Sequence, residues 1–475
     1  MGKSAVRIIC FFLATGAVLG YLNKVFKFKY SDGIYAVTTF YKLENNTVDV
    51  LFLGSSHAFI SFNGGTLWDE YGIASYALGG SVQPMWTTYY YLKEALKTQT
   101  PELIVLEGYM LMWDSDYRPV DGETIKNTFG LRWSREKIDA VKASAPREKW
   151  TGFLLEYTQY HTRYTELSDA DFLKNQNSRY YDDWKGFAML MNTEPVEPPD
   201  VSGVAERAEL YEKTERYYRA TIELAQMNNI PIMVVISPYA GISEYEQQKF
   251  NTGGDIAVEY GVPFLNCNLL YAEIGIDYST DAADTAHLNP KGSQKYSSFF
   301  GSYLVSNFDL SDRRGDAAYD SWQRNAAYVT QMSKDLNLKE TYDIEEIAEK
   351  LQDDNYWLFL TVDGNCTTSD ENLRGFFNAL GLPADGSRGV GLHNAAGWEW
   401  YPQAEEVERY IRVAHDFCIR KTANDDGTYT NSIIIDNSKY QRVTSGVNIV
   451  VYDTLTEQVA DTMGIDPNNG YIIIK

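Results

Sequence analysis

The chain alternates short, wholly apolar runs with longer segments of helical periodicity. Five apolar runs lie at 48–54, 72–80, 101–111, 228–239 and 260–268. An amphipathic helical pattern follows the second run, over 84–100. Continuous apolar strands separated by amphipathic helices are typical of a parallel sheet covered on both faces. The pattern therefore predicts an α/β fold, with a three-layer α/β/α domain over 48–310.

The character of the chain changes within this domain and again after it. Residues 114–206 carry many Tyr, Trp and charged residues and no strong strand pattern, which predicts a helical insertion over the active edge of the sheet. A polar, glycine-containing stretch at 310–318 indicates a domain boundary. An acidic helical stretch at 342–352 and several β-rich runs follow. Residues 318–475 are therefore predicted to form a β-rich accessory domain.

The N-terminal residues predict a membrane anchor. Lys3 and Arg7 precede a largely apolar, charge-free stretch at 8–22. A spanning helix needs about 20 apolar residues, a length reached when flanking apolar residues are added and the basic ends snorkel. We expect an uncleaved transmembrane anchor over 1–29, followed by a linker over 30–47. A cleaved signal peptide is the alternative, but no convincing A-x-A site follows the run.

The charge balance narrows the choice of partners. The formal net charge of the 475 residues is -23. No basic stripe exists to neutralise phosphates, which argues against nucleic-acid binding and against adhesion to an anionic membrane surface. The 36 Tyr and 10 Trp are a composition common in proteins that handle sugars, since flat amphipathic rings stack on pyranose faces. Simple packing by these residues is the alternative.

The cysteines leave the cellular compartment open. No CxxC motif or Cys/His spacing for a metal is present. Cys10 lies in the apolar N-terminal run, so at most one disulfide can join the other three, Cys267, Cys366 and Cys418. No acyl-CoA site is visible either, and neither a metal nor a cofactor is predicted.

The end of the first apolar run carries the candidate chemistry. It stops in Gly54, Ser55, Ser56 and His57. A strand that stops in small polar residues either turns or presents a hydroxyl group for chemistry. A nucleophilic Ser56 requires a base elsewhere in the chain. His57 is adjacent, but neighbours on an extended chain point to opposite sides, so it is expected to pack or to touch substrate.

The best base is His287. Asp284 precedes it by three residues, and Asn289 and Pro290 then begin a helix. A carboxylate in this position can accept the Nδ1 proton and leave Nε2 free as the base. The alternative is an N-terminal helix cap made by Asp284 or Asn289. The remaining histidines have no such partner and are expected to be structural: His161, His393 and His415.

Together, "GSSH" after the first strand and "DTAHLNPKG" before the last helix resemble the SGNH hydrolase superfamily over roughly 48–308. The resemblance implies a flavodoxin-like sheet of order 2-1-3-4-5. It makes Ser56 the nucleophile, His287 the general base and Asp284 its orienting carboxylate. Ser55 stands where many members have Asp.

The oxyanion site is where the chain departs from that pattern. The expected donors are the Ser56 backbone N–H and a glycine N–H after the second strand, from Gly79 or Gly80. Ala77 stands where many relatives have Asn, and the Gly-x-Asn-Asp element after the third strand is absent. The candidate replacements are Gln83, Glu107 and Tyr109.

Within the superfamily the chain looks most like membrane-anchored extracytoplasmic proteins of bacterial exopolysaccharide clusters, relatives of alginate O-acetyltransferase accessory proteins and of the teichoic-acid D-alanyl transfer protein. The resemblance implies a serine-dependent O-acyltransferase, acting through an acyl-Ser56 intermediate on a cell-surface polysaccharide. It also implies a membrane-bound O-acyltransferase as the source of acyl groups. A carbohydrate acetylesterase, an inert glycan-binding scaffold and a purely structural envelope protein are the alternatives.

The C-terminal part carries a second resemblance. The blocks at 354–381 and 389–400, and later at 445–459, are similar to the domain of interleukin-like epithelial–mesenchymal-transition inducers, with the two parts in reversed order. That domain occurs in some glycan-handling proteins, so the resemblance implies carbohydrate binding. The alternative is an accessory domain in which Trp398, Trp400 and Tyr401 are core residues.

Overall fold

A computed structural model describes residues 3–27, 32–167, 171, 184–382, 386–402 and 406–475. The chain divides into two compact units, 1–327 and 328–475. The division falls inside helix α16 (Asp320–Glu340), a few residues beyond the polar stretch expected to mark the boundary. Each unit is described by itself below.

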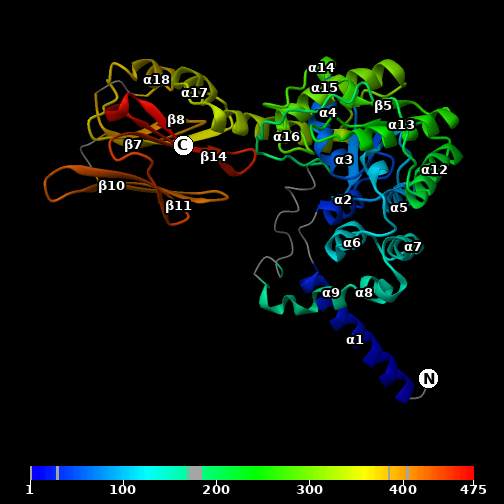
Figure 1. Cartoon of the computed structure of the whole chain (residues 1–475). Coiled ribbons are helices and arrows are strands. Elements are labelled where there is room, and N and C mark those ends of the chain that lie inside the picture. Colours follow the sequence, from blue (N-terminus) through cyan, green and yellow to red (C-terminus); the bar gives the residue numbers. More distant parts are fainter. Residues whose placement is uncertain (1–2, 28–31, 168–170, 172–183, 383–385, 403–405) are drawn as a thin grey trace. The chain divides into compact units, whose positions relative to one another are not determined.

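The first unit contains the predicted parallel sheet (Figure 1). Its strands are β1 (Val50–Gly54), β2 (Ser75–Gly79), β3 (Leu103–Glu107), β4 (Ile232–Ile236) and β5 (Phe264–Asn266). The order is β2-β1-β3-β4-β5, and every neighbouring pair is parallel. Four strands are wholly buried, and β5 at the edge is half-buried. The α/β class is confirmed.

Helices cover both faces of this sheet, which explains the unbroken apolar runs. Leu51 and Leu53 of β1 pack into a core with α2, α5, α12 and α13, whereas Val50 and Phe52 pack into a second core with α3, α4 and α15. Alternate residues of a strand point to opposite faces, so a strand covered on both sides must be apolar throughout. The helices are α3 (Ser56–Ser61), α4 (Gly64–Tyr71), α5 (Met85–Ala95), α12 (Glu212–Met227), α13 (Glu244–Glu259), α14 (Tyr271–Ile274) and α15 (Pro290–Asn307).

The segment expected to be a linker is part of the fold. Helix α2 (Asp32–Phe40) buries Ile34, Val37 and Phe40. Phe40 packs edge-on against Tyr76 of β2, with 5.1 Å between ring centroids. Because this helix is buried against the sheet, the expectation that 30–47 is a linker is wrong for residues 32–40.

The first half of the insertion is helical. Its helices are α6 (Asp121–Thr128), α7 (Arg135–Ser144), α8 (Trp150–Leu154) and α9 (Tyr157–Tyr160), joined by short 3-10 turns. Helix α6 packs on α2, and α7 packs on α5. Residues 168–170 and 172–183 of the expected insertion lie outside the described residues. From Trp184 onward the chain runs without regular structure to α12.

Helix α1 (Lys3–Phe26) is long and apolar enough to span a membrane. The window Ser4–Asn23 has a mean hydropathy of 1.9, and none of it is buried within the protein. The far end of the helix contacts the folded unit through polar bonds: the Tyr160 hydroxyl donates to Asn23 Oδ1 at 2.6 Å, and Arg163 donates to the Phe26 carbonyl at 2.5 Å.

The second unit is mostly antiparallel β-structure. One sheet has the order β15-β14-β13-β6-β7-β8 and the other β12-β11-β10-β9. Phe359 and Phe417 stack between the sheets, with 4.4 Å between ring centroids. The elements are α17 (Ile344–Lys350), β6 (Tyr356–Asp363), α18 (Arg374–Ala379), β7 (Gly389–Asn394), β8 (Gly397–Pro402), β9 (Val407–Arg412), β10 (Asp416–Ala423), β11 (Tyr429–Ile435), β12 (Ser438–Tyr440), β13 (Gly446–Asp453), β14 (Gln458–Asp466) and β15 (Ile472–Ile474).

Trp398, Trp400 and Tyr401, which were expected either to bind sugar or to be core residues, are half-buried against the apolar cores of the second unit. Trp398 donates from Nε1 to the Leu380 carbonyl at 2.6 Å, and Trp400 donates to the Ser387 hydroxyl at 3.2 Å. These contacts favour the packing interpretation. All four cysteines are free thiols, so the single disulfide that the sequence allowed is absent.

One ion pair ties the chain after α15 to the sheet. Arg313 donates from Nη2 to Asp49 Oδ1 at 2.8 Å and to Glu102 Oε1 at 3.0 Å, just before β1 and β3 respectively. The Asp49 side chain is only 5% exposed. Arg314 next to it pairs with Asp312 at the surface.

We expect Arg313→Met to lower the stability of the first unit by about 3–5 kcal/mol, because it leaves a buried carboxylate unpaired. Arg314→Met, the matched control, should cost about 0–1 kcal/mol, as exposed ion pairs do. Thermal unfolding and hydrogen exchange of β1 and β3 measure both. Equal effects of the two substitutions would contradict the assignment.

Candidate active site

Ser56 lies at a turn from strand to helix. Strand β1 ends at Gly54, and Ser56 is the first residue of α3. A Cβ at Gly54 would lie 2.9 Å from the Cβ of Glu107, so the close approach of β1 to β3 requires glycine. The hydroxyl group of Ser56 is thereby presented at the carboxyl edge of the sheet, where ligands of such sheets bind.

His287 and Asp284 meet Ser56 at this edge. The Nε2 atom of His287 lies 2.9 Å from Ser56 Oγ, across a sequence separation of 231 residues. Its Nδ1 atom lies 3.0 Å from each carboxylate oxygen of Asp284. Because an ionised carboxylate can only accept, the proton sits on Nδ1 and the Nε2 lone pair faces the serine hydroxyl.

The environment of Asp284 favours its ionised form. Partial burial raises its pKa, but the hydrogen bond from His287 and the backbone N–H groups of Ala286 and His287 outweigh it, and the pKa stays below the ordinary value. The backbone bonds are 2.7 and 2.9 Å long. These bonds lie in the loop before α15, and the helix cap considered as the alternative is made by Asn289. The Asp284 carboxylate therefore both orders the loop and orients the imidazole.

Three sets of hydrogen bonds hold the loop that carries Asp284 and His287. The Ala283 N–H donates to the His287 carbonyl at 2.9 Å, which closes the loop on itself. Asn289 caps α15 by accepting from Lys291 N at 3.0 Å and Gly292 N at 3.1 Å. The Gly241 N–H, after β4, donates to the Thr285 carbonyl at 2.6 Å.

His57 is buried and takes no part in the contact with the serine hydroxyl. It is 1% exposed and stacks on Tyr109, with 3.8 Å between ring centroids and 13° between planes. Burial, followed by the nearby His287, lowers its pKa well below the ordinary value, so it is neutral. The expected packing role agrees with these contacts, but the argument from an extended chain is wrong, because both residues belong to a helix.

Glu107 joins the ends of β3 and β4. Its Oε2 accepts from Tyr109 N at 3.1 Å and its Oε1 from Ser237 N at 3.3 Å. Burial raises its pKa to about 8, although the two backbone N–H groups oppose the shift. Both oxygens are thus engaged in holding loops, which makes Glu107 a support of the site.

The glycines after β2 have different neighbours. A Cβ on Gly79 would lie 2.6 Å from the Gly54 carbonyl oxygen and 3.2 Å from that of Ser55, which places Gly79 beside the nucleophile turn. A Cβ on Gly80 would lie 2.2 Å from Oδ1 of Asn127 on α6. Gly79 therefore lies next to the turn that carries Ser56, and Gly80 lies next to α6.

Three buried polar atoms near the turn lack a hydrogen-bond partner among the described residues: Ser55 Oγ, His57 Nε2 and Gln83 Oε1. Gln83 uses its Nε2 to donate to Thr88 at 3.0 Å and is not hydrogen-bonded to Ser56, His287 or Asp284. Buried polar groups normally find a partner, so these atoms are available to water or to a bound molecule.

Sequence reasoning missed the residues that follow β4. Tyr239 packs edge-on against His57 and Tyr109, with 5.1 and 5.3 Å between ring centroids. Ser237 and Gly241 hold Glu107 and Thr285 as described above. The signal was present in the small and polar residues after the fourth apolar run, because carboxyl ends of parallel strands meet at one edge.

Comparison with known proteins adds no identification. No protein-family model matches the chain, and no curated protein matches it. Within the described residues, no group of three His, Cys, Asp or Glu side chains could hold a metal ion. A proposal for the function therefore rests on the geometry of the site.

We expect the stability of the protein to depend on Glu107 across a defined pH window. The pKa in the folded chain is about 8 against an ordinary 4.5, so between these values the unfolded chain releases a proton that the folded chain retains. Stability therefore falls as pH rises from about 4.5 to about 8 and is constant above. Glu107→Gln should flatten the melting temperature over this window, whereas Glu209→Gln, at an exposed loop position, should not. An unchanged slope in Glu107→Gln would contradict the shifted pKa.

Proposed function

We propose that the first unit is an SGNH-type acyl-transfer domain and that it moves acyl groups, in the first place acetyl, onto a cell-surface polysaccharide through an acyl-Ser56 intermediate. The observation that carries the proposal is the chain of hydrogen bonds from Ser56 Oγ to His287 Nε2 (2.9 Å) and from His287 Nδ1 to Asp284 (3.0 Å). The sheet order supports the fold assignment.

The proposed reaction has two half-steps. Ser56 Oγ attacks the acyl carbonyl while His287 Nε2 takes the hydroxyl proton, and the oxyanion is held by the N–H groups of Ser56 and Gly79. His287 returns that proton to the leaving group of the donor, and the acyl ester forms on Ser56. A hydroxyl group of the acceptor then attacks this ester as His287 takes its proton, and Ser56 recovers the proton as the product leaves.

We base the choice of transfer over hydrolysis on residues 188–194, which lie beside the loop that carries Asp284. The Ala188 N–H donates to the Phe59 carbonyl of α3 at 2.8 Å, and the Glu194 N–H donates to the Ala282 carbonyl at 3.0 Å. These residues thus run from helix α3, which carries Ser56, to the loop that carries Asp284 and His287. In this position they would limit the access of water to the acyl-enzyme. An acetylesterase with the same three residues is the second candidate.

Helix α1 supports a location at a membrane. Its apolar window is unburied, and its far end is bonded to α9 and the following turn. We propose that it anchors the catalytic unit close to a membrane-bound O-acyltransferase that supplies acyl groups. The extracytoplasmic side is taken from the family resemblance.

Ser56 is expected to react with a serine-directed fluorophosphonate probe, because His287 activates its hydroxyl group. Labelling of the full chain in detergent should disappear in Ser56→Ala. Labelling that survives this substitution would contradict the assignment of Ser56 as the nucleophile. If the wild-type chain is not labelled at all, the inert glycan-binding scaffold becomes the favoured function.

Turnover of an activated acetyl ester should fall by about 10³-fold or more in His287→Ala, and by less in Asp284→Asn, because a serine hydroxyl is weakly nucleophilic without a positioned base. His415→Ala is the matched control, since His415 also bonds an aspartate, Asp436, at 2.7 Å but in the second unit. An unimpaired His287→Ala protein would mean that another residue is the base.

Transfer and hydrolysis are separated by offering the full chain an acetyl ester with and without oligosaccharide acceptors. We expect acetylated oligosaccharide to form at the expense of free acetate, because an acceptor hydroxyl group replaces water in the second half-step. Rapid acetate release with no glycan acetylated would leave the esterase candidate in place.

A further inference from the structure

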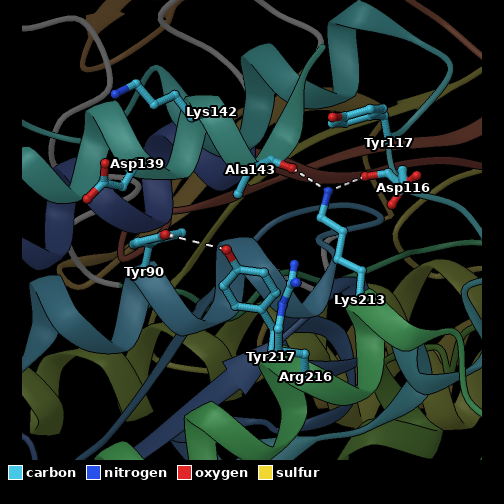
Figure 2. A pocket seen from close by; sticks show the side chains of 9 residues that line it. All are labelled: Tyr90, Asp116, Tyr117, Asp139, Lys142, Ala143, Lys213, Arg216 and Tyr217. Atoms are coloured by element: carbon cyan, nitrogen blue, oxygen red, sulfur yellow. Dashed lines mark hydrogen bonds between the residues drawn. The ribbon is translucent and has the colours of Figure 1, made fainter. Parts of the chain in front are cut away.

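The first unit has a recess built from elements that do not carry Ser56, Asp284 or His287. It lies among α5, α7, α12 and the loop after β3, and it encloses about 330 Å³ (Figure 2). Ligand pockets begin at about this size. Figure 2 shows the side chains of α7 on one side and those of α12 on the other, with Tyr90 of α5 between them.

A buried ammonium group forms one wall. Lys213 is 8% exposed, and its Nζ donates to the Ala143 carbonyl at 2.6 Å and to the Asp116 carbonyl (Figure 2). It also lies 4.0 Å from the ring centroid of Trp86 and 4.4 Å from that of Tyr117. Burial lowers its pKa to about 8, and the nearby Arg216 adds to the shift, although the Asp116 carboxylate opposes it.

Two further cations line the recess, and neither forms a salt bridge with the two carboxylates of the lining, Asp116 and Asp139. Lys142 of α7 and Arg216 of α12 are exposed, and neither forms a salt bridge with any carboxylate that the structure describes. The Asp139 carboxylate at the recess pairs with Arg135 at 3.5 Å. In a chain of net charge -23, a lining in which three cations outnumber two carboxylates is a local exception.

Tyrosines complete the lining. Tyr90, Tyr117 and Tyr217 present ring faces and hydroxyl groups, and the hydroxyls of Tyr90 and Tyr217 lie 3.5 Å apart. Ring faces with nearby hydroxyl groups suit the flat apolar side and the polar edge of a pyranose. Guanidinium and ammonium groups suit a carboxylate or a phosphate.

We propose that this recess binds an anionic sugar unit, one that carries a carboxylate or a phosphate group, and that the acceptor polysaccharide contains such units. The statement that the acceptor polysaccharide contains such units rests on the proposed function. Binding of the sugar unit in the recess does not require chemistry at Ser56. Tyr109, whose ring stacks on His57, precedes Asp116 by seven residues. That length of chain spans at most about 25 Å, so recess and nucleophile are within reach of one oligosaccharide.

The test measures binding to the Ser56→Ala full chain in detergent by ligand-observed NMR. The probes are D-glucuronate, D-glucose 6-phosphate, D-glucose and inorganic phosphate. We expect at least one anionic sugar to bind saturably and at least about 10-fold more tightly than glucose or phosphate. Whichever of the two binds identifies the charged group. No saturable binding of either would overturn the proposal, as would phosphate or glucose binding equally well.

Variants locate the site. Arg216→Ala and Lys142→Ala should each weaken binding of the anionic sugar by about 10-fold, with partial recovery in Arg216→Lys. Arg324→Ala, at an exposed position outside the recess, should leave binding unchanged. Equal binding by all four variants would place the ligand elsewhere. Because Ser56→Ala cannot transfer acyl groups, a failure here is distinct from a failure of the catalytic proposal, which the fluorophosphonate and turnover measurements test.

Discussion

The site depends on one hydrogen bond, the 2.9 Å contact between Ser56 Oγ and His287 Nε2. Its partners lie 231 residues apart in the sequence of the first unit, so it forms only if β1 and the loop before α15 reach the same edge of the sheet. Parallel strands supply that edge, because their carboxyl ends all lie on one side. Gly54 permits the required approach of β1 to β3, and the bond from Gly241 to Thr285 fixes the loop that carries the base.

Electrostatics at this edge assign one role to each titratable group. Asp284 remains ionised through hydrogen bonds from three donor groups, two of them backbone N–H. Burial keeps His57 neutral and raises the pKa of Glu107 to about 8. In the proposed reaction, the Asp284 carboxylate is therefore the charge that would stabilise an imidazolium at His287. In the recess beside Lys213, by contrast, three cations outnumber two carboxylates.

The sequence predicted the parts that depend on local pattern. Apolar runs buried on both faces revealed the five strands, and the polar residues at the ends of strands and before the last helix pointed to Ser56, Asp284 and His287. The parts that depend on three-dimensional packing could not be read in the same way. Helix α2 lies in the core because its short apolar face fits beside β2. His57 packs on Tyr109 because helix α3 begins at Ser56, so His57 has a helical and not an extended backbone. The recess gathers residues from three helices whose spacing in sequence carries no signal.

The central claim is that an acyl group is carried on Ser56. It is tested most directly by mass spectrometry of peptides from the wild-type full chain, acid-quenched during reaction with an activated acetyl ester. The account predicts an acetyl group on the peptide that contains Ser56, at the serine itself, with much less in His287→Ala. Product formation with no acetylated Ser56, or with the acetyl group on another residue that the reaction requires, would contradict it.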